Sequence, residues 1–283
     1  MNEFRKLKKW IKKILKWESL SSRKRWSIKF QLFDISTYIF NFLPLSLTSL
    51  CSFYGSDKWG DHFYTLVYDN IFRSLRRKKI NLLEIGVGGY ADPYSGGESI
   101  FLWKAYFPFA RLFFIDIVDK THFSQNRVRV VQGSQDDANV LLNVVREAGE
   151  FDIIIDDGSH INHHQIASFE TLFPSLKEGG IYVIEDTQTS YWPSFGGGGN
   201  KTREYENSCM RYFLRLADEL NYGEYLDEEY SPGKFNKKII EISFHHNLIV
   251  VIKGNNDQVS VIGSKNISKL KRPISFHSDE KYH

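Results

Sequence analysis

Two acidic segments each follow a short apolar run, and both contain residue types that bind cations and move protons. Asp156, Asp157 and His160 stand in DDGSHIN directly after FDIII, and Glu185 and Asp186 end the run IYVIED. If both runs are strands of one parallel sheet, their carboxyl ends lie side by side and Asp157, Glu185 and Asp186 converge. Converging carboxylates raise each other's pKa unless a cation lies between them. Oxygen ligands without cysteine favour a hard ion such as Mg²⁺, so these three residues are predicted metal ligands.

His160 lies on the loop predicted to open the next helix, three residues after Asp157. A neutral imidazole beside a metal-bound hydroxyl can accept its proton near neutral pH, which makes His160 the candidate general base. An isolated histidine at this position would instead cap or pack, and the neighbouring acids favour the catalytic interpretation. His163 and His164 start the predicted helix and are interpreted as surface residues.

A glycine-rich segment, LEIGVGGYADPYSGGES, connects the first predicted strand to a helix. Gly86, Gly88 and Gly89 let the backbone turn sharply and approach a ligand closely, although a tight strand-to-helix turn needs the same residues. The spacing is not that of the dinucleotide fingerprint. The long insertion also predicts that no helix amino terminus follows at once to receive a pyrophosphate. Asp116 ends the next strand, where α/β nucleotide binders place an acid for ribose hydroxyls.

Polar residues also follow the third predicted strand, in QGSQDD. Ser134, Gln135 and Asp136 are available to bond an adenine edge, and the alternative is helix capping by Ser134 or Asp136.

The segment after the last parallel strand, DTQTSYW, is the predicted acceptor side. Gln188, Tyr191 and Trp192 are candidate substrate contacts because aromatic faces stack on sugar rings, although such aromatics equally serve as core. The glycines of FGGGGN (195–200) predict a flexible loop over the site.

The elements that must position these residues alternate between β-rich and helical patterns. Near-continuous apolar runs predict parallel strands covered by helices on both faces, at 80–86, 111–117, 128–133, 151–156 and 181–186. Residues 237–254 predict two strands joined at His245, His246 and Asn247, a connection too tight for a parallel crossover. Five parallel strands and an antiparallel hairpin predict an α/β, Rossmann-like class I methyltransferase sheet.

Composition describes an ordinary globular chain with an unusual beginning. Of its 283 residues 42% are hydrophobic, and two distant cysteines suit a reducing compartment, so the cytoplasm is expected. Residues 1–30 carry eleven Lys and Arg against two Glu, and the remainder of the chain is mildly acidic. This asymmetry argues against a nucleic-acid groove through the fold.

The first residues, MNEFRKLKKWIKKILKW, do not resemble a secretory signal because lysines interrupt every apolar stretch. Their helical periodicity predicts a basic amphipathic helix, which suits the surface of an anionic membrane or packs on the body with its lysines solvated. Residues 35–50 are too short and too polar for a membrane span. The expected organisation is a basic segment over 1–50, the catalytic domain over 51–265 and a polar tail over 266–283.

Several motifs together resemble the macrocin and mycinamicin sugar O-methyltransferases. They are YGSDKWGDHFYTLVY (54–68), LEIGVGGYADPYSGGES, GSQDD, FDIIIDDGSHIN and SFETLFPSLKEGGIYVIEDTQTSYW, in order over roughly residues 53–255. The resemblance implies S-adenosylmethionine (SAM) as methyl donor and Mg²⁺-assisted transfer to a sugar hydroxyl.

If the roles of the family's residues apply at the matching positions of this chain, the resemblance implies that Asp157, Glu185 and Asp186 are the metal ligands and that His160 is the general base. Glu84, Gly86 and Gly88 would hold the methionine part of SAM, Asp116 its ribose, and Ser134, Gln135 and Asp136 the adenine side. The macrolide enzymes carry an extra amino-terminal domain where this chain has a short basic segment, which argues against a macrolide acceptor. Because this basic segment with its tryptophans suits work beside the inner membrane, where lipid-linked glycans are assembled, the expected acceptor is a sugar of a surface polysaccharide, of lipopolysaccharide or of another glycoside, and a homo-oligomer stays open. The alternatives are a metal-dependent enzyme for phenolic or other small acceptors and a catalytically silent SAM- or glycan-binding module at the membrane.

Overall fold

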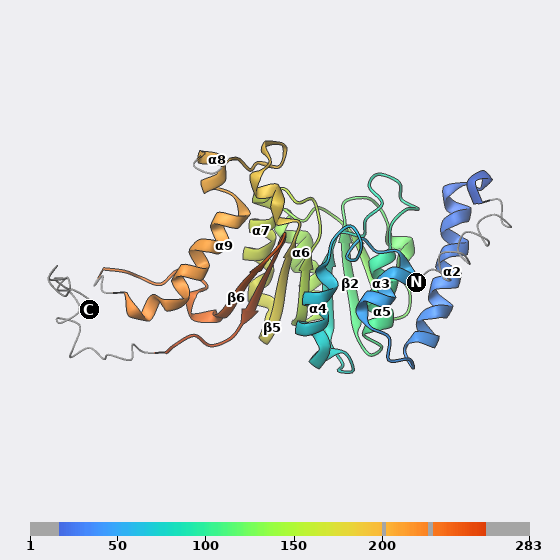
Figure 1. The fold of residues 1–283 in the computed structure, drawn as a ribbon, viewed down its shortest axis with the longest axis horizontal. Helices are drawn as coiled ribbons and strands as arrows, with labels where there is room; N and C mark the ends of the chain where they lie inside the picture. Colours follow the sequence, from blue (N-terminus) through green and yellow to red (C-terminus); the bar gives the residue numbers. More distant parts are fainter. Residues whose placement is uncertain (1–16, 200–201, 226–228, 259–283) are drawn as a thin grey trace, which may run out of the picture.

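The computed structural model describes residues 17–199, 202–225 and 229–258. They form one seven-stranded sheet, in the order β3-β2-β1-β4-β5-β7-β6, between two layers of helices (Figure 1). The predicted amphipathic helix lies largely in residues 1–16 and the predicted tail in 266–283, both outside the described residues.

The first five strands are parallel, and the last two form an antiparallel hairpin at one edge. Their bounds are β1 (Asn81–Ile85), β2 (Arg111–Asp116), β3 (Val128–Gln132), β4 (Phe151–Asp156), β5 (Leu176–Glu185), β6 (Ile239–His245) and β7 (Leu248–Lys253). The predicted fold class is therefore confirmed. β5 begins five residues earlier than predicted because Gly179, which looks like a break in the sequence, continues the strand at a φ of 77°.

Helices cover both faces of the sheet, which explains why its strands are apolar on both sides. One face carries α3 (Leu47–Tyr54), α4 (Tyr64–Phe72) and α5 (Glu98–Tyr106), and the other carries α6 (Ala138–Ala148), α7 (Asn162–Leu172) and α9 (Cys209–Asp218). Alternate strand residues enter two separate clusters: Leu82 and Ile153 pack with the first group, and Leu83 and Ile154 with the second.

Short helical segments fill the connections. They are η1 (Trp17–Ser19), η2 (Arg73–Leu75), η3 (Thr121–Phe123), η4 (Phe173–Ser175), η5 (Thr187–Tyr191), η6 (Pro193–Phe195), α8 (Arg203–Glu206), η7 (Glu219–Glu224) and η8 (Asn236–Lys238).

The long helix α2 (Ser22–Phe40) lies outside this layer and packs on α5 (Figure 1). Ser21 caps its amino terminus by accepting a hydrogen bond from the Lys24 amide, and Phe30 contacts Phe101 edge-on at 5.3 Å between ring centroids. No helix among the described residues combines the length and hydropathy that a bilayer span needs.

The register of the three central strands sets the height of the polar residues at their carboxyl ends. Asp156 on β4 pairs with Ile85 on β1 and with Ile184 on β5. The next residue of each strand therefore reaches the same level, which places Gly86, Asp157 and Glu185 side by side at the edge where open α/β sheets bind ligands.

Candidate active site

The turn after β1 depends on Gly86. Its φ is 97°, and its amide donates a 2.7 Å hydrogen bond to the Ile115 carbonyl oxygen on β2. A Cβ atom at this position would lie 2.0 Å from the Asp157 carbonyl oxygen, so no other residue fits between the ends of β1 and β4. The sharp turn is present, and the backbone that Gly86 approaches closely is that of the acidic segment; the approach to a ligand stays a prediction.

The insertion after this turn folds back on itself. A Cβ on Gly96 would lie 2.3 Å from the Gly88 carbonyl oxygen, and the Gly97 amide donates to the Val87 carbonyl oxygen at 2.7 Å. The amino terminus of α5 consequently returns to the end of β1, contrary to the expectation that the insertion would separate them. A cavity of about 170 Å³ lies there, lined by Gly55–Asp57, Gly86–Gly89, Glu98, Ser99 and Asp157.

Asp116 lies at the end of β2, as predicted, and its carboxylate holds the glycine turn. Oδ2 accepts a hydrogen bond from the Val87 amide and Oδ1 from the Val118 amide, both at 2.9 Å. Each oxygen retains a second lone pair for a ligand hydroxyl.

Ser134, Gln135 and Asp136 follow β3 as expected but have different environments. Ser134 donates to the exposed Asp136 carboxylate, whereas Gln135 is buried and accepts the Ser159 amide at 2.6 Å. Helix α6 is capped by Asp137, which accepts from the Asn139 amide, and not by Ser134 or Asp136.

Asp156 is fully buried and supports the loop from below. Its carboxylate accepts hydrogen bonds from the Gln135 side chain at 3.1 Å and 3.2 Å and from the Ser168 hydroxyl. Burial raises the pKa of Asp156 from 3.8 to about 6, although these donors oppose the shift. Asp156 is thus a structural acid next to the functional segment.

Lys58, in the turn between α3 and α4, lies among three carboxylates. The Nζ atom is 2.7 Å from Oδ2 of Asp157, 2.6 Å from Oε1 of Glu185 and 3.1 Å from Oε1 of Glu84. Tyr68 also donates its hydroxyl to Oε1 of Glu185. Burial acts to lower the pKa of Lys58, but the three acids raise it well above its usual value.

The acids of this cluster are themselves shifted toward the protonated form. Burial raises the pKa of Glu185, with a further contribution from Asp157, and raises that of Glu84 to about 7, while Lys58 opposes both shifts. Glu84 is fixed by the Trp103 indole, which donates to Oε2 at 3.0 Å.

Asp186 turns away from that cluster because its backbone is left-handed, with φ 55° and ψ 39°. Tyr64 donates its hydroxyl to Oδ1 at 2.7 Å, His62 Nε2 lies 3.5 Å from the same oxygen, and His160 Nε2 lies 3.4 Å from Oδ2. Burial acts to raise the pKa of Asp186, but His160, Tyr64 and His62 bring it below its usual value.

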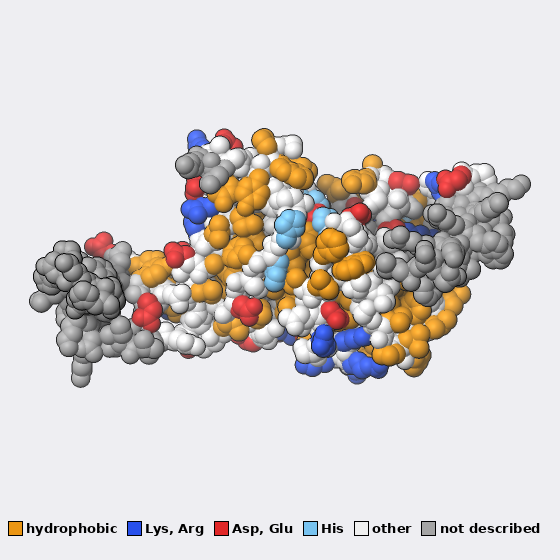
Figure 2. Space-filling view, viewed as in Figure 1, with side chains coloured by type: hydrophobic (Ala, Val, Ile, Leu, Met, Phe, Trp, Pro, Cys, Tyr) orange, Lys and Arg blue, Asp and Glu red, His pale blue; other side chains and the backbone are white. Residues whose placement is uncertain are grey.

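His160 also has a left-handed backbone, with a φ of 56°, which aims its ring at Asp186. Nδ1 is buried and has no hydrogen-bond partner among the described residues. Its neighbours differ: His163 is exposed, as predicted, whereas His164 lies partly buried between Ser159 and Asp136. Figure 2 shows histidine and acidic side chains together at the upper middle of this face.

The predicted metal ligands fall into two groups that share Asp157. Glu84, Asp157 and Glu185 form an inner group, and Asp157, His160 and Asp186 form an outer one; within each, one ligand atom per residue lies within 4.8 Å of the others. The predicted convergence of the strand ends is present, but Glu185 and Asp186 point into different groups. Carboxylate oxygens and one imidazole are a donor set that suits a hard divalent ion.

Sequence reasoning did not assign roles to Lys58, His62 and Tyr64, which all come from the segment YGSDKWGDHFY. One signal was available, because three acids predicted to converge in a buried position require a compensating cation. Nothing in the spacing indicates that a lysine about 100 residues earlier supplies it.

The predicted acceptor residues lie beyond the outer group. Gln188 belongs to η5 and has a buried Oε1 without a partner among the described residues. Tyr191 and Trp192 are 45% and 48% exposed, and Tyr191 stacks on Tyr205 at 5.6 Å between ring centroids. They are surface aromatics and do not belong to the core.

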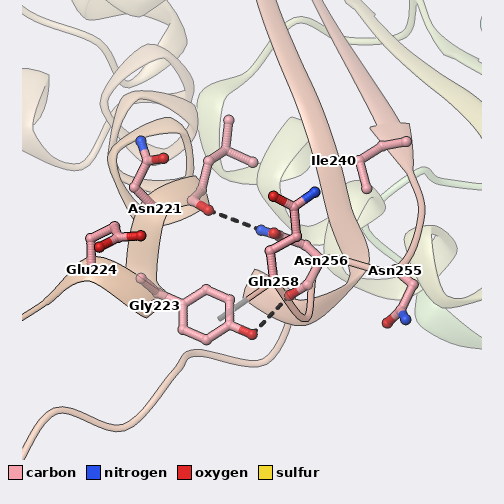
Figure 3. Close-up of a pocket in the computed structure, with 9 residues that line it drawn as sticks. Asn221, Gly223, Glu224, Ile240, Asn255, Asn256 and Gln258 are labelled. Carbon is pink, nitrogen blue, oxygen red and sulfur yellow. Dashed lines mark hydrogen bonds between the residues drawn. The ribbon is translucent and has the colours of Figure 1, made fainter. Parts of the chain in front are cut away.

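A second cavity, of about 340 Å³, lies at the far edge of the sheet, between η7 and the segment that follows β7 (Figure 3). Asn256 crosses it, donating to the Leu220 carbonyl oxygen at 3.0 Å and accepting from the Tyr222 hydroxyl at 2.8 Å. None of the predicted site residues lines it.

The chain is similar in sequence to known methyltransferases. A family described as a methyltransferase domain matches residues 92–187. The mycinamicin VI 2''-O-methyltransferase of Micromonospora griseorubida is 42% identical over 75% of this chain and 53% of its own length. The demethylmacrocin O-methyltransferase of Streptomyces fradiae is 39% identical over 77% of this chain and 55% of its own length.

The fold agrees with a solved structure of one such enzyme. MycE methyltransferase, in complex with Mg, SAH and mycinamycin VI, superposes with a TM-score of 0.73 at 39% identity, covering 81% of this chain and 60% of that one. The chain thus spans between half and two thirds of the length of these relatives. With its sheet, its glycine turn and its acidic strand ends, the chain belongs to the macrocin- and mycinamicin-type sugar O-methyltransferase family.

Proposed function

We propose that this chain transfers the methyl group of SAM to a sugar hydroxyl with the assistance of Mg²⁺. The observation that carries the proposal is the position of the outer group, Asp157, His160 and Asp186, at the strand edge that also bears the glycine-lined cavity. Asp157 belongs to both, so a methyl donor in the cavity and an ion at the acids would be adjacent. The crystallised relative MycE bound Mg and SAH.

The proposed cofactor site extends from the end of β1 to the end of β3. Gly86 and Gly88 give backbone access to the methionine part, Glu84 lies beneath the turn, and Asp116 offers its remaining lone pairs to the ribose. On the adenine side Ser134, Gln135 and Asp136 stay the proposed contacts. For Gln135 the support is indirect, because its buried amide fixes Ser159 and Asp156.

Asp157 and Asp186 of the outer group and Glu185 of the inner group are the proposed metal ligands, with Asp157 common to both groups. When bound, Mg²⁺ would lower the pKa of the acceptor hydroxyl and fix its direction. The protein contributes the alignment, since methyl transfer requires oxygen, methyl carbon and sulfur in line.

His160 is the proposed general base. Oδ2 of Asp186 lies 3.4 Å from Nε2, so this contact orients the ring toward the acids. In that role the imidazole would accept the hydroxyl proton at its unprotonated nitrogen while the acceptor oxygen bonds to the methyl carbon and the carbon–sulfur bond of SAM breaks, releasing S-adenosylhomocysteine. Trp192, Tyr191 and Gln188 are proposed to contact the acceptor sugar.

The proposed acceptor is a sugar of a surface polysaccharide, of lipopolysaccharide or of another glycoside. Residues 1–30 carry a net charge of +9, which favours peripheral binding to an anionic membrane and hence work on its cytoplasmic side. In this proposal residues 51–265 form the catalytic domain, and the segment over 1–50 keeps it near lipid-linked glycans.

Mass spectrometry of envelope glycans tests the reaction in the cell. A deletion strain should lose a methyl group from one sugar, wild-type protein should restore it, and the His160→Ala variant should not. Glycans identical to wild type in the deletion strain would exclude a glycan acceptor of this kind.

Flotation with anionic liposomes tests the membrane contact. Replacing Lys8, Lys9, Lys12, Lys13 and Lys16 by glutamine in the full chain should abolish flotation, whereas replacing the exposed Lys234 and Lys237 should not. Equal flotation of both variants would argue against the basic segment.

A further inference from the structure

The three proposed metal ligands share a feature that their residue types do not reveal: a protein donor already contacts one oxygen of each carboxylate. Lys58 donates a hydrogen bond to Oδ2 of Asp157 at 2.7 Å, and Lys58 and Tyr68 both donate to Oε1 of Glu185. Tyr64 donates to Oδ1 of Asp186 at 2.7 Å. Each carboxylate is thereby left with one oxygen outside these contacts, and for Asp186 that oxygen, Oδ2, lies 3.4 Å from Nε2 of His160.

These donors are firmly positioned. The side chain of Lys58 is 1% exposed, and its ammonium has three protons for three carboxylates that come from three adjacent strands. Tyr64 and Tyr68 are buried on α4, the helix that follows the Lys58 turn. The capping groups therefore belong to one segment, 58–68, which lies against the ends of β1, β4 and β5.

Divalent ions differ in how they use carboxylates. Ca²⁺ takes six to eight oxygens and often binds both oxygens of a carboxylate, whereas Mg²⁺ requires a near-octahedral shell, retains waters and uses few protein ligands. A carboxylate whose second oxygen is held by an ammonium or a phenol can offer only the first oxygen. Capping therefore penalises Ca²⁺ more than Mg²⁺.

We propose that Lys58 and Tyr64 are the determinants of metal selectivity in this site, because they restrict Asp157, Glu185 and Asp186 to one oxygen each. The ammonium of Lys58 also lies among all three acids of the inner group, so an ion can use only the oxygens outside its contacts. This inference rests on the proposed dependence on Mg²⁺ and adds which residues make the site prefer Mg²⁺ to Ca²⁺.

Calorimetric titration of the full chain with MgCl₂ and with CaCl₂ tests the proposal without measuring activity. Wild type should bind one Mg²⁺ more tightly than Ca²⁺. In Lys58→Met and in Tyr64→Phe the ratio of the two dissociation constants should move toward Ca²⁺ by about tenfold or more, which corresponds to about 1.4 kcal/mol.

Lys104→Met is the matched control, because Lys104 is equally buried and paired with Asp34 on the far side of α5. The ratio of its dissociation constants for Mg²⁺ and Ca²⁺ should equal that of wild type. If Lys58→Met does not fold, Tyr64→Phe decides, since it keeps the aromatic ring and removes only the hydroxyl.

The outcomes separate the two levels of the proposal. Wild-type protein that binds neither ion would overturn the metal dependence and the selectivity together. Wild-type protein that binds Mg²⁺, with an unchanged ratio in the folded Lys58 or Tyr64 variant, would overturn the selectivity role alone.

Discussion

His160 combines an Nε2 that lies 3.4 Å from Oδ2 of Asp186 with a buried Nδ1 that lacks a partner among the described residues. A histidine that only packed or capped would be expected to satisfy its buried nitrogen. The left-handed backbone at His160 also costs free energy, which agrees with a position selected for aiming the ring.

His160→Ala should therefore reduce turnover by about 10²–10⁴-fold, the usual contribution of a positioned base. Its affinity for S-adenosylhomocysteine should stay at the wild-type value, because the proposed cofactor residues lie on β1, β2 and β3. Steady-state kinetics and calorimetry measure the two quantities.

His163→Ala is the control for this prediction, since His163 is exposed in the first turn of α7 and belongs to neither group of candidate metal ligands. Turnover of the His160 variant within a few-fold of the His163 variant would contradict the assignment of the base.

For single residues, the sequence correctly predicts that Asp157, Asp186 and His160 are neighbours. This prediction needs only the order of the strands, because the carboxyl ends of adjacent parallel strands lie side by side. It misses the orientation of Glu185, because that depends on the buried Lys58 and Tyr68 from a distant turn. Gln135 shows the same limit. The strand order correctly predicts its place after β3, but it does not predict that its side-chain amide hydrogen-bonds Asp156 and Ser159.

Among the elements, the turn after β1 is the most constrained. Gly86→Ala would introduce a methyl group 2.0 Å from the Asp157 carbonyl oxygen at a φ of 97°. The variant should lose about 3 kcal/mol of unfolding free energy from clash and backbone strain together, and its affinity for S-adenosylhomocysteine should fall. Urea unfolding and calorimetry measure these effects.

Gly179→Ala provides the comparison, because its φ is 77° and no atom lies within 4 Å of the added Cβ. The Gly179→Ala variant should lose only about 1 kcal/mol of unfolding free energy, and its affinity for S-adenosylhomocysteine should equal that of wild type. Equal losses in both variants would show that the approach of β1 to β4 is not tight.

The segment of η5 and η6 is the proposed acceptor side. Trp192→Ala should raise the KM for the sugar acceptor while leaving the affinity for S-adenosylhomocysteine unchanged, because the ring contributes stacking area. Phe109→Ala removes an aromatic of similar exposure, 52% against 48%, at the opposite end of the strands and should have no effect. The same KM for the acceptor in both variants would argue against Trp192 as a contact of the acceptor sugar.

For the molecule as a whole, the buried acids predict how stability changes with pH. The pKa of Asp156 is raised to about 6 in the folded state, so the folded protein holds this proton where the unfolded chain has lost it. Stability from this group is therefore present at low pH and lost as the pH rises toward and past 6.

The Asp156→Asn variant isolates this contribution. Relative to the variant, wild type should lose about 2 kcal/mol of unfolding free energy between about pH 4.5 and about pH 7.5. Urea unfolding in EDTA measures the difference, and a value independent of pH would show that Asp156 keeps an ordinary pKa.

The fold of the whole domain was predictable because hydrophobic periodicity and connection lengths are local properties. The return of the α5 amino terminus to the end of β1 was not predictable. Residues 88–96 fold back through close contacts between glycines, and the length of the insertion does not indicate these contacts.

The central claim is metal-assisted methyl transfer to a sugar, and the most direct measurement is transfer of labelled methyl from SAM to glycan acceptors by the purified chain. We predict label in a sugar O-methyl group, loss of transfer in excess EDTA and recovery when Mg²⁺ is added. Transfer that persists unchanged in EDTA, or label that never enters a sugar, would contradict the account.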